Sequence, residues 1–259
     1  MADLDGSTPN VARMYDYYLG GTANFAADRE AAERVLNLVP ALRGSVRTNR
    51  AFLTRAVRYL VASGIEQFLD IGAGLPTQGT VHQVAHESNP RVRVAYADYD
   101  PVVVSHGEAL LTPQDRSIMM RGDLRSPEEL LASPALRAHL DLGKPVAVVM
   151  LAVLHFLSDA DDPGAVVTAF RDAMAPGSYL VISHVSGDFF ADQATVDRAV
   201  AVYEQANERI WPRGRDEILA YFGGFELVNP GLVPSHEWRP VAGETHPASI
   251  GWSGVGLRH

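Results

Sequence analysis

Three carboxylates occupy matching places in the sequence, each at or just after a short apolar run. Asp70 lies in "FLDIGAGLP", Asp98 ends "RVRVAYAD", and Asp123 follows "SIMMRG". Apolar runs of this length between turn residues are typical of buried parallel strands, whose carboxyl ends meet at one edge of a sheet. At that edge Asp98 could accept hydrogen bonds from both hydroxyls of a ribose, and Asp123 one from an adenine amino group. The set predicts a ligand that contains adenosine.

The turn after the first apolar run narrows the choice of ligand. Gly72 and Gly74 let a ligand approach the backbone, but a dinucleotide fingerprint needs a third glycine where Thr77 stands. Pro76 also removes an amide donor from any pyrophosphate cradle. S-adenosylmethionine has no phosphate and needs only the close approach, with Asp70 facing its cationic amino end. An NAD-dependent oxidoreductase is therefore the less favoured alternative.

Two histidines follow the fourth and fifth apolar runs, where a substrate beside the cofactor would lie. His155 comes after "VAVVML", and His184 ends "SYLVISH". The pKa of histidine lies near neutrality, so either residue could remove a proton from a methyl acceptor or orient the acceptor. Nothing in the sequence identifies either histidine as a general base. A non-catalytic regulator that binds the cofactor or a metabolite therefore stays open as an alternative.

Aromatic residues crowd the amino-terminal segment and recur late in the chain. The candidates for contacting a flat substrate are Tyr15, Tyr17, Phe25, Tyr203 and Trp211, with Trp238 as a further member of the same cap. Folded over the site, these rings would stack on the substrate. The alternative is that they form the buried faces of helices.

Two patterns resemble metal sites, and we expect neither to bind metal. His82 and His86 in "HQVAH" are one helical turn apart, but Gln83 stands where a zinc peptidase has its glutamate. They are predicted to be solvent-facing helix residues. In "SDADDP", Asp162 is predicted to cap a helix that begins at Pro163 rather than to bind magnesium.

Alternating strands and helices must position these residues. Strands are predicted over 67–71, 91–98, 117–123, 146–151 and 178–184, and the helices between them over 80–88, 101–111, 126–140 and 163–174. Such alternation is typical of a parallel sheet covered by helices on both faces. Two further helices are predicted over 193–210 and 215–223. The strand candidates within 225–238 and 249–258 have no crossover helix between them and should pair antiparallel at the sheet edge.

Helical periodicity also precedes the first strand, over 10–20, 26–39 and 45–64. We therefore expect residues 1–64 to form a helical lid over the carboxyl edge of the sheet. Residues 65–259 would form the cofactor-binding domain, and the two parts one compact unit.

Bulk composition excludes several other classes of function. The chain has 259 residues, 47% hydrophobic and 20% charged, as expected for a globular α/β protein. Its net charge of -9 disfavours nucleic acid and leaves a small-molecule substrate. There is no cysteine, no signal-peptide pattern, and no apolar stretch of the roughly 20 residues that span a bilayer. We expect a cytoplasmic monomer or homodimer without membrane association.

Several stretches together resemble the class I S-adenosylmethionine-dependent methyltransferases, and more closely the actinobacterial S-adenosyl methyltransferase family 19, formerly of unknown function. They include "VARMYDYYLGGTANFAADREAAERVL", "QFLDIGAGLPTQGTVHQVA", "YADYDPVVVSHGEALL", "MLAVLHFL" and "ELVNPGLVPSHEWRP". The resemblance implies a Rossmann-like fold with a seven-stranded, mostly parallel sheet and one antiparallel strand. It also implies S-adenosyl-L-methionine as cofactor and S-adenosyl-L-homocysteine as product. Methylation of a small aromatic or heteroaromatic metabolite of specialised metabolism is the leading hypothesis.

The same resemblance implies cofactor contacts at several strand ends. Those expected along the methionine part are Asp70, Gly72, Ala73 and Gly74. Those expected around the ribose and adenine are Asp98, Tyr99, Asp123 and Leu124. Leu151 and Ala152 would pass beneath the sulfonium, and Tyr18 and Arg50 are further candidates from the amino-terminal helices. Ala73 and Leu75 make the turn alanine-rich rather than glycine-rich, which departs from the usual pattern.

Overall fold

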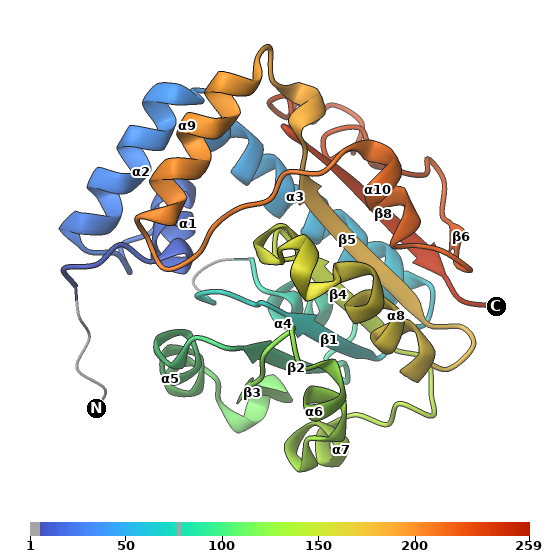
Figure 1. Ribbon diagram of the computed structural model, residues 1–259. Helices are drawn as coiled ribbons and strands as arrows, with labels where there is room; N and C mark the ends of the chain where they lie inside the picture. The colour runs from blue at the N-terminus through green and yellow to red at the C-terminus, as the bar shows by residue number, and fades with distance from the viewer. Residues whose placement is uncertain (1–5, 77–78) are drawn as a thin grey trace.

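A mostly parallel sheet forms the centre of the structure, a computed structural model that describes residues 6–76 and 79–259 (Figure 1). The strand order is β3-β2-β1-β4-β5-β8-β6, and β7 also pairs with β8. The strands are β1 (Gln67–Ile71), β2 (Arg93–Asp98), β3 (Ser117–Arg121), β4 (Ala147–Leu151), β5 (Tyr179–Val185), β6 (Glu226–Leu227), β7 (Val233–Pro234) and β8 (Gly251–Leu257). The first five pair in parallel, as predicted. Because the order reverses between β1 and β4, a crevice is expected at their carboxyl ends.

The far edge of the sheet contains the predicted antiparallel pairing. β8 runs antiparallel to β5 and to the short strands β6 and β7. The strands β6 and β7 pair with successive parts of β8, on either side of a turn that contains the cis Asn229–Pro230 bond. The described sheet thus has eight strands in seven positions, because β6 and β7 both pair with the same side of the antiparallel strand β8, and this agrees with the expected arrangement.

Side chains alternate between the two faces of the sheet, and each face is covered by helices. Leu69 and Ile71 of β1 belong to the core beneath α6 (Pro127–Ala132), α7 (Pro134–His139), α8 (Pro163–Ala173) and α10 (Arg215–Ala220). Phe68 of the same strand faces the opposite core, with α3 (Leu42–Ala62), α4 (Val81–His86) and α5 (Pro101–Leu110). The two buried faces explain why the parallel strands are continuous apolar runs in the sequence. Short 3-10 helices span Pro113–Asp115, Leu154–Phe156, Asp159–Asp161 and Gly187–Phe189.

A third apolar core lies beyond the carboxyl edge of the sheet. It is formed by α1 (Val11–Leu19), α2 (Ala26–Leu38), the first turns of α3 and α9 (Gln193–Glu204). Figure 1 shows α1, α2 and α9 side by side at this end of the molecule. The later turns of α3 instead pack against the sheet. The cap thus combines the amino-terminal helices with a helix from late in the chain, and α9 ends six residues earlier than its predicted limit of 210. No helix in the described ranges is long and apolar enough to cross a membrane.

A buried ionic network fixes the start of the cap. The Asp28 carboxylate is fully buried and accepts hydrogen bonds from Arg13 Nε at 2.7 Å, from the Asn10 amide at 2.8 Å and from the Phe25 amide at 2.7 Å. Arg13 is itself buried. The last of these bonds places Asp28 in the first turn of α2 as its capping acid, with Phe25 at the N-cap position.

Replacing Asp28 by asparagine should lower the free energy of unfolding by about 3 kcal/mol, because the substitution leaves the buried Arg13 cation without its counterion. Urea unfolding measures the change. The control is Glu33→Gln, also on α2, whose exposed bridge to Arg43 should contribute less than about 1 kcal/mol. Equal stabilities for Asp28→Asn and the wild type would show that the network does not hold the cap.

Candidate active site

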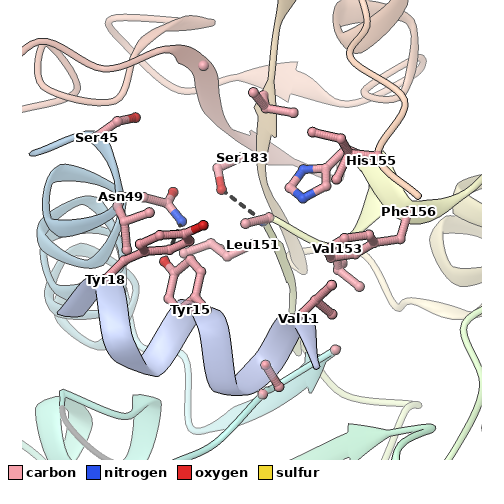
Figure 2. Close-up of a pocket in the computed structure, with 18 of the residues that line it drawn as sticks. Val11, Tyr15, Tyr18, Ser45, Asn49, Leu151, Val153, His155, Phe156 and Ser183 are labelled. Atoms are coloured by element: carbon pink, nitrogen blue, oxygen red, sulfur yellow. Dashed lines mark hydrogen bonds between the residues drawn. The ribbon is translucent and has the colours of Figure 1, made fainter. Parts of the chain in front are cut away.

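One pocket joins the carboxyl ends of the central strands to the cap. It encloses a cavity volume of about 210 Å³. The residues predicted from sequence that line it are Asp70, Gly72, Ala73, Gly74, Asp98, Tyr99, Leu151, Ala152, Tyr15, Tyr18, Arg50, His155, His184 and Tyr203. Figure 2 shows Tyr15, Tyr18 and Asn49 on one side of this pocket and His155 on the other. The structure thus brings together residues from both halves of the chain.

The glycine turn after β1 is held against the end of β2. Gly72 and Gly74 have φ angles of 66° and 61°, in the left-handed region that favours glycine. A Cβ on Gly72 would lie only 2.2 Å from the Val153 side chain, so this position has no room for a larger residue. The Gly74 amide donates to Asp98 Oδ2 at 3.0 Å. Thr77, the residue that weakens the dinucleotide reading, lies outside the described residues.

Asp98 is anchored by the backbone around it. Its Oδ1 accepts from the Asp100 amide at 3.0 Å, while Oδ2 accepts from Gly74. Burial raises the pKa of Asp98 to about 6, and the backbone donors act in the opposite direction. The buried carboxylate is therefore held in one orientation in the pocket lining, with lone pairs remaining for a ligand.

Asp70 and Arg50 face the pocket from opposite elements. Burial raises the pKa of the Asp70 carboxyl to about 7, the Arg50 cation lowers it, and Asp98 raises it further. Arg50 lies with its guanidinium carbon 5.8 Å from the Tyr15 ring centre. Its Nε is buried and has no hydrogen-bond partner among the described residues. A carboxyl group and an unsatisfied guanidinium donor at one end of a pocket suit a zwitterionic amino acid.

The loop after β4 is strained where it enters the pocket. Ala152 has a φ of 52°, a conformation that costs a residue other than glycine of the order of 1 kcal/mol. Its amide donates to Ser183 Oγ at 3.1 Å, and Figure 2 marks Ser183 beside this loop. Ser183 on β5 therefore supports the backbone of Ala152 from the neighbouring strand.

The two predicted histidines lie next to each other at the pocket wall. The ring centres of His155 and His184 are 5.6 Å apart. His184 Nδ1 lies 2.7 Å from the Val185 carbonyl oxygen, which can only accept, so Nδ1 carries the hydrogen and Nε2 keeps its lone pair. Burial lowers the pKa of His184 to about 4 and holds the pKa of His155 well below its usual range. Both rings are neutral at pH 7.

His184 Nε2 and His155 Nδ1 are buried without a hydrogen-bond partner in the described structure. The backbone of His155 is fixed, because its carbonyl oxygen accepts from the Trp211 amide at 2.7 Å. His184, a residue of the pocket lining, therefore keeps an unused acceptor nitrogen, Nε2.

The part of the pocket under the cap forms a mostly apolar chamber, which we call the acceptor chamber. Its members are Tyr15, Tyr18, Val35, Val39, Ser45, Val46, Asn49, Phe190, Ala199, Tyr203 and Ile250. The hydroxyls of Tyr18 and Tyr203 lie 3.3 Å apart, and burial raises the pKa of Tyr203 to about 12. Both phenols therefore remain protonated. Apolar and aromatic walls with a few polar groups are typical of sites for small organic molecules.

Several residues predicted to contact ligands lie outside the lining of this pocket. Tyr17 donates from its hydroxyl to Glu33 at 2.5 Å on the outer face of the cap. The half-exposed ring of Phe25 lies under Arg13. Trp211 lines a separate hollow beside α9, with Arg209 over its ring. None of the three is among the residues that line the pocket.

The third acid of the predicted series is also outside the pocket lining. Asp123 is 40% exposed and accepts from the Arg125 amide at 2.9 Å, so it closes a turn. Leu124 is buried in the core beside Leu130. The acids after β1 and β2 thus line the pocket, whereas the acid after β3 does not.

Trp238 and His82 lie elsewhere than predicted, whereas Asp162 lies where predicted. Trp238 does not contribute to a cap, because it is fully buried between Phe52 and Tyr59. The prediction of a solvent-facing His82 is wrong, since its ring is buried and its Nδ1 lies 2.8 Å from the Tyr96 hydroxyl oxygen. Asp162 caps α8 as predicted, by accepting from the Ala165 amide at 3.0 Å.

Sequence reasoning missed several polar residues of the pocket lining, among them Asn49 and Ser183. Asn49 and Ser183 were not distinguished from ordinary helix and strand residues. Their only signal in the sequence is a polar side chain at a position where the periodicity of the helix or strand calls for an apolar one.

The comparisons with known proteins decide the family. The sequence profile of a family described as S-adenosyl methyltransferase matches residues 1–259. The chain belongs to this family. It is accordingly an S-adenosylmethionine-dependent methyltransferase, and its cofactor is S-adenosyl-L-methionine. Among curated proteins, none has a significantly similar sequence.

Solved structures agree with the family assignment. The methyltransferase resembles a crystal structure from Thermobifida fusca YX, provisionally described as a methyltransferase, with 39% identity and a TM-score of 0.90 over 99% of this chain and 97% of that one. A DUF574 family protein from Streptomyces avermitilis MA-4680 is 35% identical, with a TM-score of 0.91 over 98% and 99% of the two chains. Human N-acetylserotonin methyltransferase in complex with S-adenosylmethionine shares the fold, at 14% identity and a TM-score of 0.52 over 98% and 63%.

Proposed function

We propose that this methyltransferase transfers a methyl group to a small aromatic or heteroaromatic molecule of specialised metabolism. The observation that carries the proposal is the acceptor chamber, an apolar, tyrosine-lined space that opens directly onto the glycine turn and the acids of β1 and β2. Aromatic walls favour flat apolar ligands.

The residues of the pocket fit S-adenosyl-L-methionine. Asp98, held by two backbone amides, would accept hydrogen bonds from the ribose hydroxyls. Asp70 would face the ammonium group, and the unsatisfied Nε of Arg50 would donate to the carboxylate. When bound, the cofactor supplies a methyl carbon activated by a positively charged sulfur.

The chain itself must align the acceptor, exclude water and handle the acceptor's proton. The cap contributes most of the chamber's walls and would exclude water from it. His184 Nε2, neutral and without a partner, would accept the hydrogen bond of the acceptor's hydroxyl or amine and take its proton as the new bond forms. The low pKa of His184 suits a proton transfer that occurs late in the reaction, because the acceptor's oxygen or nitrogen becomes strongly acidic only once it is being methylated.

Replacing His184 by phenylalanine is expected to lower methyl transfer at least 100-fold, within the range usual for a general base, while the affinity for S-adenosyl-L-homocysteine stays within twofold. The assay incubates the enzyme and labelled S-adenosylmethionine with a panel of phenols and heteroaromatic amines and detects methylated products by mass spectrometry. The control is Tyr17→Phe, whose hydroxyl lies outside the pocket. Absence of any product with the wild type would contradict the proposed acceptor class.

A further inference from the structure

Asn49 presents a second buried acceptor that the proposed chemistry does not use. The residue is nine-tenths buried, its Nδ2 donates to the Tyr15 hydroxyl at 3.1 Å, and its Oδ1 has no hydrogen-bond partner among the described residues. Asn49 lines the pocket, its amide nitrogen is already engaged, and Figure 2 shows its side chain beside Tyr15 and Tyr18. A buried acceptor of this kind is satisfied only by a ligand that brings an N–H or O–H donor.

Asn49 and its neighbour Arg50 serve different parts of the pocket. Asn49 shares a face of α3 with Ser45 and Val46, one turn earlier, and all three line the acceptor chamber. Arg50 instead turns toward the loop after β1, where its Cδ would lie 3.7 Å from a Cβ on Gly79 and its charge acts on Asp70. The neighbouring side chains of Asn49 therefore belong to the chamber rather than to the cofactor end.

The charges around the pocket disfavour an anionic acceptor. Arg50 is the single arginine or lysine among the described lining residues, and it lies at the cofactor end. The acidic lining residues are Asp16, Asp70, Asp98, Asp100 and Glu208. A carboxylate that entered the chamber would lose its hydration with no cation to replace it.

We propose that Asn49 is a specificity-determining residue, whose Oδ1 selects an uncharged acceptor molecule that carries a hydroxyl or N–H donor besides the group that is methylated. This inference rests on the proposed function. His184 Nε2 receives the reacting group, and Asn49 Oδ1, on the cap side of the same pocket, receives the second donor. The acceptor class is accordingly a neutral aromatic molecule with two donors, such as a diphenol.

Calorimetric titration of the protein saturated with S-adenosyl-L-homocysteine tests this inference. The probes are biphenyl diols with one hydroxyl on each ring, in the ortho, meta or para position, together with their monomethyl ethers and the matching carboxylates. We expect the best diol to bind at least tenfold more tightly than its monomethyl ether, a difference in binding free energy of about 1.4 kcal/mol. The carboxylates should show no binding. This comparison needs no variant protein.

The variant Asn49→Leu should abolish the tenfold preference for the diol, whereas Tyr17→Phe should retain it. The affinity for S-adenosyl-L-homocysteine should stay within twofold in both. Equal binding of diol and ether by the wild type, binding of the carboxylate, or no saturable binding of any diol would overturn the inference. So would a loss of S-adenosyl-L-homocysteine affinity in Asn49→Leu, which would place Asn49 at the cofactor. Failure of the wild type to bind S-adenosyl-L-homocysteine would instead contradict the proposed function itself.

Discussion

Asp98→Ala should weaken the binding of S-adenosyl-L-homocysteine at least 100-fold. The substitution removes the carboxylate that would accept from both ribose hydroxyls, and each hydrogen bond to a charged group contributes roughly 1.5 to 3 kcal/mol. It also releases the Gly74 amide, which Asp98 holds at 3.0 Å. Calorimetric titration at pH 7.5 measures the affinity.

Asp123→Ala is the matched control for this prediction. Asp123 ends the third predicted strand as Asp98 ends the second, but the structure places it in an exposed turn outside the pocket lining. Its removal should change the affinity less than twofold. A large loss with Asp123→Ala, or a small one with Asp98→Ala, would show that the ribose and adenine lie elsewhere than we propose.

The affinity for S-adenosyl-L-homocysteine should also depend steeply on pH. Burial raises the pKa of Asp70 to about 7 in the free protein, so the carboxyl is increasingly protonated below neutrality. A protonated carboxyl no longer attracts the ligand's ammonium group, whose own charge is constant over this range. The affinity should therefore fall by roughly tenfold per pH unit below pH 7 and level off above it. Titrations between pH 5.5 and 8 measure the slope.

Asp70→Asn separates this explanation from others. The variant should bind S-adenosyl-L-homocysteine weakly at pH 7.5 and should lose most of the pH dependence of the affinity, with a smaller dependence remaining from Asp98, whose pKa is about 6.

The stability of the free protein should depend on pH in the opposite direction. A raised carboxyl pKa means that the folded free protein loses stability as pH rises from about 4 to 7, by an amount of the order of 4 kcal/mol. Asp70→Asn should therefore unfold at higher urea concentration than the wild type at pH 7.5. If the affinity of the variant for S-adenosyl-L-homocysteine still fell as steeply below pH 7, a group other than Asp70 would be responsible for the pH dependence.

The sheet could be predicted from the sequence because parallel strands buried on both faces leave a local signal. Runs such as "VAVVML" are apolar throughout, and the helices between them have their own periodicity. The antiparallel edge was predictable from the missing crossover helix before β8. The cap was not predictable in full, because the docking of α9 against α2 is a contact between segments distant in sequence.

The same difference between local and tertiary information applies to the pocket. The strand-end positions of Asp70 and His184 follow directly from strand periodicity. The positions of Tyr17 and Tyr18 do not, because adjacent residues of a helix point in different directions, and only Tyr18 faces the chamber. Trp238 was mistaken for a cap residue because its burial depends on Phe52, almost two hundred positions earlier in the chain.

The most direct test of the account is a calorimetric titration of the purified protein with S-adenosyl-L-homocysteine, run beside NAD. We predict saturable binding of S-adenosyl-L-homocysteine and none of NAD, since the pocket provides acids for a ribose and a zwitterion. Binding of NAD in its place, or of neither ligand, would contradict the assignment of this pocket to the methyl donor.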